Sequence, residues 1–243
     1  PEAPIPVLRV ERETAMAGGA GNVARNVAAL GACVRLTAAV GADNAARWLG
    51  QLIAAEARIE AELVADPGRQ TAIKTRYVGG NQQMLRTDLE TIAPLGADAR
   101  ARVIAAVEAA LADCAVLVLS DYGKGALQGG VAAELIALAR NAKRTVIVDP
   151  KGRDWSPYAG ADVVTPNKRE LAEAAGADVG DDAAAIAAAR ALIARHRLGA
   201  VLVTLGPDGM ILVGADGSCE HLRAEAREVF DVSGAGDTAV AAL

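Results

Sequence analysis

The segment Ala115–Asp149, AVLVLSDYGKGALQGGVAAELIALARNAKRTVIVD, predicts one strand–helix–strand unit and decides the fold. Its ends, Ala115–Ser120 and Thr145–Asp149, are short and almost entirely apolar, which is typical of strands that are covered on both faces. Between them, Val131–Arg140 is rich in Ala and Leu, with apolar residues three and four positions apart, as in a helix. A strand, a helix and a strand in this order predict a parallel sheet.

The same alternation continues toward the C-terminus. Asp162–Val164 and Ala200–Leu205 are again short apolar runs that contain Val, and Met210–Val213 is the next predicted strand. Asn167–Ala175 and Asp182–Arg195 have the apolar spacing of helices. The predicted fold class is therefore α/β, with a doubly wound, mostly parallel sheet and helices on both faces.

The N-terminal part has a different pattern. Val7–Val10, Thr71–Val78 and Gln83–Leu89 alternate apolar and polar side chains, as antiparallel strands with one wet face do. We interpret them as a small β-sheet lid beside the main sheet, with segments at about residues 3–10 and 71–89. The other elements predicted in this part are a core strand at 34–40 and helices at 22–30 and 43–55.

Composition excludes several classes of function. With 52% hydrophobic and 23% charged residues in 243, the chain has the composition of a globular protein and not of a disordered one. A net charge of −5 and few aromatic residues argue against a nucleic-acid partner. We find no apolar run of membrane-spanning length and no signal peptide at the start, so we expect no membrane partner and a cytoplasmic location.

Cysteines and histidines are too few for several kinds of site. Cys33, Cys114 and Cys219 are odd in number and lack C-x-x-C spacing, so we expect buried thiols in a reducing compartment and no disulfide framework. With only His196 and His221, the chain has no H-E-x-x-H zinc motif and little scope for Ser-His-Asp chemistry. Carboxylates, Lys, Arg and backbone amides remain as the chemical groups.

The strongest local signal is the segment from Asp231 to Thr238, DVSGAGDT. A Gly-Ala-Gly run that opens a helix leaves the N–H groups of Gly234, Ala235 and Gly236 to bind an anion such as a phosphoryl group. Asp237 could then accept a proton from an attacking hydroxyl. The alternative is that Asp237 only caps the helix, and the spacing alone does not separate the two interpretations.

A second signal follows the strand that ends at Val164, in the segment TPNKRE. Strand ends of parallel sheets face the ligand crevice, and Asn167 and Glu170 are three positions apart in the first helical turn. Such a pair can hold a hydrated Mg²⁺ or a phosphate through water. The alternative is an ordinary capping box, which this spacing also gives.

Two further strand ends carry weaker signals. Thr204–Gly209, TLGPDG, offers a hydroxyl and glycines that suit a nucleotide, although P-D-G is also a standard tight turn. Asp149–Gly152, DPKG, supplies the cation of Lys151, although lysines in such loops are usually only solvated.

Another signal is the glycine-rich segment Ala17–Asn22, AGGAGN, which precedes a predicted helix. Its small residues allow a polar ligand to come close, and the Asn22 amide can both donate to and accept from sugar hydroxyls. The alternative is a tight turn capped by Asn22. The segment matches neither a P-loop nor G-x-G-x-x-G, which argues against a dinucleotide site.

In this order, the Gly-Gly start, the N-x-x-E pair and DVSGAGD resemble the ribokinase-like (PfkB) carbohydrate kinases over nearly the whole chain. Further segments are similar to the members of that family that phosphorylate D-glycero-β-D-manno-heptose 7-phosphate. These segments are PEAPIPV from Pro1, GGAGNVA from Gly18, NQQMLRTD at 81–88, LSDYGKG at 119–125 and DPKG at 149–152.

The resemblance implies transfer of the ATP γ-phosphate to the C1 hydroxyl of that heptose phosphate, giving the 1,7-bisphosphate for ADP-heptose and lipopolysaccharide core synthesis. It implies Asp237 as the base and an anion hole formed by Gly234, Ala235 and Gly236. For ATP and Mg²⁺ it implies Asn167, Lys168, Arg169 and Glu170, with Glu170 acting on the metal through water, and for the nucleotide cleft Thr204, Gly206 and Gly209. For the sugar phosphate it implies Gly19, Asn22, Arg86, Asp88 and Lys151.

Arg86 is the candidate for the phosphate already on the sugar, because a planar guanidinium can bind it with two hydrogen bonds. Asp88 would bind hydroxyls or orient Arg86, and the alternative is a purely structural salt bridge between the two. The remaining alternatives for the function are a kinase of another sugar or nucleoside, and a non-catalytic module that binds sugar phosphates.

The resemblance also implies one kinase domain over residues 1–243, incomplete at both ends, because the family begins with a further strand and ends with further helices. We expect the lid to close over the sugar and to pair with the lid of a second subunit in a homodimer.

Overall fold

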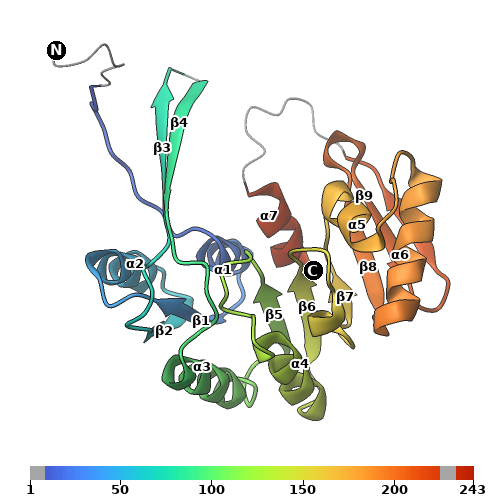
Figure 1. The fold of residues 1–243 in the computed structure, drawn as a ribbon, viewed down its shortest axis with the longest axis horizontal. Helices are drawn as coiled ribbons and strands as arrows, with labels where there is room; N and C mark the ends of the chain where they lie inside the picture. The colour runs from blue at the N-terminus through green and yellow to red at the C-terminus, as the bar shows by residue number, and fades with distance from the viewer. Residues whose placement is uncertain (1–8, 81, 225–233) are drawn as a thin grey trace.

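The computed structural model describes residues 9–80, 82–224 and 234–243. Its central sheet contains β5 (Val116–Ser120), β6 (Thr145–Asp149), β7 (Val163–Val164), β8 (Ala200–Thr204), β9 (Met210–Gly214) and β10 (Cys219–Leu222). The strand order is β10-β9-β8-β7-β6-β5 (Figure 1). Strands β5 to β8 are parallel, whereas β9 and β10 are antiparallel additions at one edge. The predicted α/β fold with a mostly parallel sheet is confirmed.

Helices cover both faces of this sheet. They are α1 (Ala20–Ala29), α3 (Ala97–Ala110), α4 (Val131–Asn141), α5 (Lys168–Ala175), α6 (Asp182–His196) and α7 (Ala235–Ala242). Another helix, α2 (Asn44–Ala54), packs instead against residues 59–65. On one face, Val146 and Val148 of β6 join a core with side chains of α3 to α6. On the other, Ile147 packs with Val23 of α1 and Val240 of α7. Burial on both faces explains why the strand sequences are continuously apolar rather than alternating.

A second, two-stranded sheet holds β1 (Val34–Val40), whose bounds match the prediction, and β2 (Ile59–Ala65), which the sequence did not predict. They run parallel, with Val34 opposite Ile59. The sequence of β2, IEAELVA, has charged side chains at exposed positions and only two buried ones, so neither an apolar run nor a strict alternation marks it.

The predicted lid is an antiparallel hairpin of β3 (Ile73–Gly79) and β4 (Gln82–Leu89), which projects from the body of the molecule (Figure 1). Every residue of β4 is exposed. The other predicted lid segment, 3–10, falls mostly on residues 1–8, outside the described residues. Its described end was predicted wrongly: Arg9 and Val10 are exposed and form no strand, because β3 and β4 pair only with each other in the described chain.

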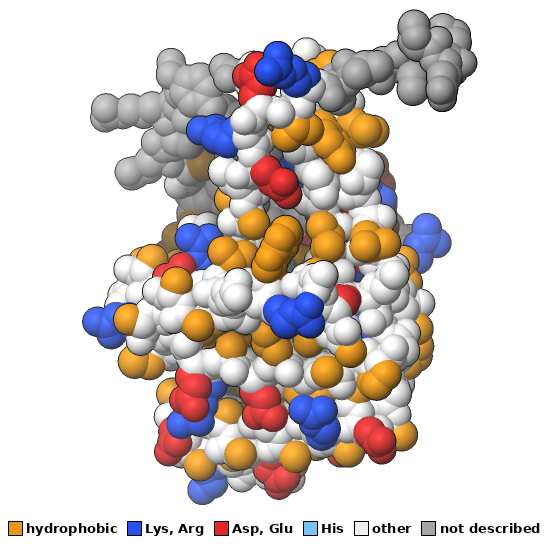
Figure 2. Space-filling view, turned by 90° about the vertical axis from the view of Figure 1, so that its left-hand side faces the viewer, with side chains coloured by type: hydrophobic (Ala, Val, Ile, Leu, Met, Phe, Trp, Pro, Cys, Tyr) orange, Lys and Arg blue, Asp and Glu red, His pale blue; other side chains and the backbone are white. Residues whose placement is uncertain are grey.

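The hairpin has one apolar and one charged face. Ile73 lies opposite Leu89 and Tyr77 opposite Leu85, and the leucine side chains are about half exposed. Apolar side chains lie among charged ones on the side of the molecule shown in Figure 2.

Within the described chain, no helix combines the length and the apolar character needed to cross a membrane.

Candidate active site

Gly234 is the N-cap of helix α7 and has φ 83° and ψ 5°, a left-handed conformation that glycine adopts without strain. A Cβ atom at this position would lie 3.0 Å from Nδ2 of Asn22, so the glycine also makes room for a neighbouring side chain. The first backbone hydrogen bond of the helix runs from the N–H of Thr238 to the carbonyl of Gly234. The N–H groups of Ala235, Gly236 and Asp237 precede that bond and have no acceptor within the helix. Asp231 and Ser233 of the predicted motif lie outside the described residues.

Two side chains from distant parts of the chain hold the carboxylate of Asp237. Nδ2 of Asn22, on α1, donates to Oδ2 over 2.6 Å, and the Tyr122 hydroxyl, after β5, donates to Oδ1 over 2.9 Å. A hydrogen bond of 3.3 Å from Asn26 to Thr238 links the same two helices beside them. The carboxylate therefore serves as an acceptor for other elements, and no side-chain cap was found at the start of α7.

Gly19 caps α1 with φ 58° and ψ −133°, a conformation that is closed to residues with a side chain. A Cβ atom there would lie 3.2 Å from Cε2 of Tyr122. The structure thus brings the two predicted sugar-site residues Gly19 and Asn22 together with Asp237, with the Tyr122 ring between them.

The loop that carries Tyr122 is fixed by Asp121. Its N–H donates to the carbonyl of Asp149 over 3.0 Å, and its carboxylate accepts from the N–H of Gly123 over 2.7 Å. The Tyr158 hydroxyl donates to the other carboxylate oxygen over 2.6 Å. The ends of β5 and β6 are therefore joined by hydrogen bonds of Asp121, the residue before Tyr122.

Asp149, the last residue of β6, lies in a crowded negative field. Burial raises its pKa to about 7, and the charges of Glu170, Asp237 and Asp121 act in the same direction, opposed by Lys151. In the described part of the chain, no three carboxylates or other ligand side chains are close enough to hold a bare metal ion. A cation with its own water shell would relieve this excess of negative charge.

Glu170 takes part in two arrangements at once. The Asn167 side chain accepts from the Glu170 N–H, and Glu170 Oε2 accepts from the Asn167 N–H, which confirms the capping box. Oε1 accepts from Nζ of Lys151 over 2.8 Å, and the Glu170 side chain is only 13% exposed. The box therefore holds Glu170 where it pairs with Lys151.

The other two residues of the N-x-x-E segment point elsewhere. Nζ of Lys168 donates to the carbonyl of Gly180, and Arg169 pairs with Glu173 one helical turn away, with its side chain 85% exposed. No hydrogen bond or ion pair in the described residues joins Lys168 or Arg169 to Asp237.

Of the three residues predicted for the nucleotide cleft, two have positions that suit a ligand and one has a structural role. Thr204 ends β8 and forms a bridge with Asn167, so it lies at the same edge of the sheet. Gly206, with φ 64°, has open space where a Cβ atom would be. Gly209, with φ 95°, packs so closely that a Cβ atom would lie 2.0 Å from the carbonyl oxygen of Leu222. This close contact explains why a glycine is needed at position 209 in the turn, without any ligand.

On the lid, Arg86 and Asp88 form a two-pronged salt bridge within β4, with distances of 2.9 and 3.1 Å. Nζ of Lys74, across the hairpin, donates to Asp88 over 2.8 Å. Arg76 lies directly opposite Arg86 in the register. No contact in the described chain joins Arg86 or Asp88 to Asp237, so the structure does not bring these predicted substrate residues to the candidate base.

The root of the hairpin is bonded to the Tyr122 loop. Arg69, with a side chain only 6% exposed, donates to the carbonyls of Thr91 over 3.3 Å, Ala93 over 2.6 Å and Lys124 over 2.9 Å. The ammonium group of Lys124 also pairs with Glu90. The segments at the root of the hairpin are thus joined to the loop that carries Tyr122 through Lys124.

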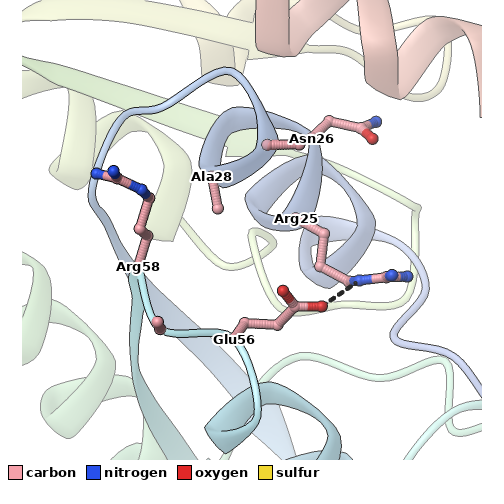
Figure 3. A pocket seen from close by; sticks show the side chains of 7 residues that line it. Arg25, Asn26, Ala28, Glu56 and Arg58 are labelled. Carbon is pink, nitrogen blue, oxygen red and sulfur yellow. Dashed lines mark hydrogen bonds and ion pairs between the residues drawn. The ribbon is translucent and has the colours of Figure 1, made fainter.

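A pocket of about 390 Å³ lies behind α1, lined by Arg25, Asn26, Glu56 and Arg58 among others (Figure 3). Arg25 pairs with Glu56 over 2.8 Å, whereas Arg58 points away from that pair and donates to the carbonyl of Gly31. Its cations are thus already engaged and do not converge, and Asp237 does not line it.

The sequence motifs predicted no role for Asp121, Tyr122 or Asp149. All three follow or end a strand of the parallel sheet, and ligand crevices form at this end of such sheets. The position at the strand end was the available signal, but the identity of the partner, Asp237, required the fold.

Comparisons with known proteins identify the relatives of this chain. Residues 3–243 match the model of the pfkB family carbohydrate kinases. The chain is 55% identical to the bifunctional protein HldE of Paramagnetospirillum magneticum and 53% identical to that of Rhodospirillum rubrum, over all of its own length. It covers 50% and 49% of those two proteins, so the chain spans about half the length of the curated relatives it matches.

Among solved structures, the tetrameric inhibited form of phosphofructokinase-2 from Escherichia coli matches with a TM-score of 0.83, at 22% identity, over 99% of this chain and 79% of that one. Ribokinase of Arabidopsis thaliana, complexed with ribose and ATP, matches with a TM-score of 0.71, at 18% identity, over 97% and 76% of the two chains. These likenesses show the fold, and the match to the family model covers nearly every residue. The chain belongs to the pfkB family of carbohydrate kinases.

Proposed function

We propose that this chain transfers the γ-phosphate of ATP to the C1 hydroxyl of D-glycero-β-D-manno-heptose 7-phosphate, giving the 1,7-bisphosphate for ADP-heptose and lipopolysaccharide core synthesis. The observation that carries the proposal is the carboxylate of Asp237, held by Asn22 and Tyr122 beside the open N–H groups of α7. The choice of this sugar rests on the segments NQQMLRTD, LSDYGKG and DPKG and on the identity to the HldE proteins along the whole chain.

In this proposal Asp237 accepts the proton of the attacking hydroxyl. Backbone N–H groups at the start of α7, from Gly234 to Gly236, stabilise the negative charge on the migrating phosphoryl group. Such amides are fixed in place before the reaction and do not reorganise during it. Asn22 is bonded to Asp237 and Gly19 packs against Tyr122, and both would contact the sugar near its reacting hydroxyl.

ATP would lie along the carboxyl ends of β7 and β8, near Asn167, Thr204 and Gly206. Both carboxylate oxygens of Glu170 already accept hydrogen bonds, which favours contact with a hydrated Mg²⁺ through water over direct coordination. When bound, Mg²⁺ neutralises phosphate charge. Lys151, paired with Glu170, would reach the phosphates from the same side.

The lid is proposed to bind the phosphate already on the sugar. Arg86 and Arg76 lie opposite each other in the hairpin, so two guanidinium groups are available on one face, where Asp88 is the present partner of Arg86. A phosphate dianion suits the planar guanidinium groups. Asp88 would then keep its bond to Lys74 while Arg86 turns to the substrate.

A screen of ATP consumption tests the function. Heptose 7-phosphate, fructose 6-phosphate, ribose and adenosine are offered to the full-length enzyme and to an Asp237→Asn variant. We expect turnover with the first sugar. We expect the rate of the variant to be lower by about 100-fold or more, because the variant lacks the base while the rest of the site remains. Turnover with another acceptor alone would replace the heptose assignment, and an active variant would remove Asp237 as the base.

A further inference from the structure

Tyr122 donates a hydrogen bond of 2.9 Å to Oδ1 of Asp237, a residue 115 positions away. We propose that Tyr122 is a positioning residue, whose hydroxyl fixes the orientation of the Asp237 carboxylate toward the acceptor hydroxyl. The inference rests on the proposed function, in which Asp237 is the base, and it adds a residue that neither the motifs nor the resemblance assigned.

The hydroxyl of Tyr122 is held in place before any substrate binds. Its ring packs against Gly19, where a side chain would come within 3.2 Å, and Gly19 has a backbone conformation closed to other residues. The neighbouring Asp121 is fixed by its hydrogen bonds to Asp149 and Tyr158. A donor held on both sides in this way restricts where the acceptor carboxylate can settle.

The direction of the hydrogen bond is also determined. Burial and the negative charge of Asp237 raise the pKa of the Tyr122 hydroxyl well above its ordinary value. The hydroxyl therefore stays protonated and acts as a donor, and Asp237 acts as the acceptor.

Asn22 and Tyr122 each donate a hydrogen bond to a different oxygen of the Asp237 carboxylate. Asn22 donates to Oδ2 over 2.6 Å and Tyr122 donates to Oδ1, so rotation about the Cβ–Cγ bond is blocked at both oxygens. Each carboxylate oxygen has two lone pairs, and one on each remains for the acceptor hydroxyl. Because proton transfer needs the reacting atoms at close and aligned positions, loss of one donor should lower the rate without much effect on binding.

The test is Tyr122→Phe, which keeps the ring against Gly19 and removes only the hydroxyl. In the full-length enzyme with heptose 7-phosphate and ATP, we expect kcat to fall about 10-fold or more, with both KM values within about two-fold of the parent. The matched control is Asn26→Ala, which removes another bond between α1 and α7 without touching Asp237. Its kcat should stay within about two-fold.

A second measurement separates positioning from structural support. In an Asp237→Ala background, Tyr122→Phe should change the residual rate by less than about two-fold, because a residue that acts through Asp237 has nothing left to orient. An equal loss in both backgrounds, an unchanged kcat, or a loss confined to KM overturns the inference. If Asp237→Asn itself remained active, the proposed function would fail first, so the two failures are distinguishable.

Discussion

At the scale of single residues, the site depends on side chains that meet only after folding. The sequence predicted Asp237, Asn22 and Glu170 because each lies in a motif with a helix-start spacing. Tyr122 and Asp149 were missed, since a single Tyr or Asp after a strand carries no periodic signal. Their roles follow from contacts with Asp237 and from burial, which the sequence alone does not supply.

The shifted pKa of Asp149 gives a prediction on stability. The pKa is raised from its ordinary value of 3.8 to about 7, so the folded protein binds this proton more tightly than the unfolded chain does. The free energy of unfolding therefore falls as pH rises from about 4 to about 7, by up to roughly 1.4 kcal/mol per pH unit, and levels off above that.

We expect Asp149→Asn to remove this dependence. Relative to the parent, the variant should gain stability between about pH 4 and about pH 7, and the gain should then stay constant. Urea unfolding of both proteins in metal-free buffer at several pH values measures the difference. A difference that does not change with pH would contradict the assignment of the raised pKa to Asp149.

At the scale of elements, strands covered on both faces were the most predictable. The continuous apolar runs of β6 and β8 and the regular spacing of α4 and α6 gave bounds within a residue or two. β2 was missed because its exposed glutamates interrupt the apolar pattern. Helix α3 was also missed: many of its apolar positions are alanines, which mark a buried face only weakly.

The lid hairpin carries the prediction on specificity. Arg86→Ala should raise KM for a phosphorylated sugar by about 10-fold or more and leave KM for ATP within about two-fold, because only one ligand loses its charge-assisted bonds. Arg102→Ala, an exposed arginine on α3 away from the lid, is the control and should change neither value. An Arg86→Ala variant with an unchanged sugar KM would leave the Arg86–Asp88 pair as a structural salt bridge.

At the scale of the whole molecule, the hairpin presents an apolar face that nothing in the described chain covers. A two-stranded hairpin is marginally stable alone, so the same face on a second copy is the proposed partner. Self-complementary contact of this kind gives a symmetric dimer.

The proposed homodimer predicts that Leu85→Asp sediments as a monomer at micromolar concentration, where the parent sediments as a dimer, because a buried carboxylate would oppose the contact. Ile92→Asp, another exposed apolar residue outside the hairpin, should leave the dimer intact. A monomeric parent, or a dimer that both variants retain, would place the subunit contact elsewhere or exclude it.

The buried guanidinium of Arg69 has one more consequence. It donates to two carbonyls of the segment that follows β4, those of Thr91 and Ala93, and to the carbonyl of Lys124 in the segment that carries Tyr122. Arg69 therefore connects the root of the hairpin to the segment that carries Tyr122. If a sugar binds under the hairpin as proposed, a movement of the hairpin on binding would also act on the segment that carries Tyr122, and through its hydrogen bond on Asp237.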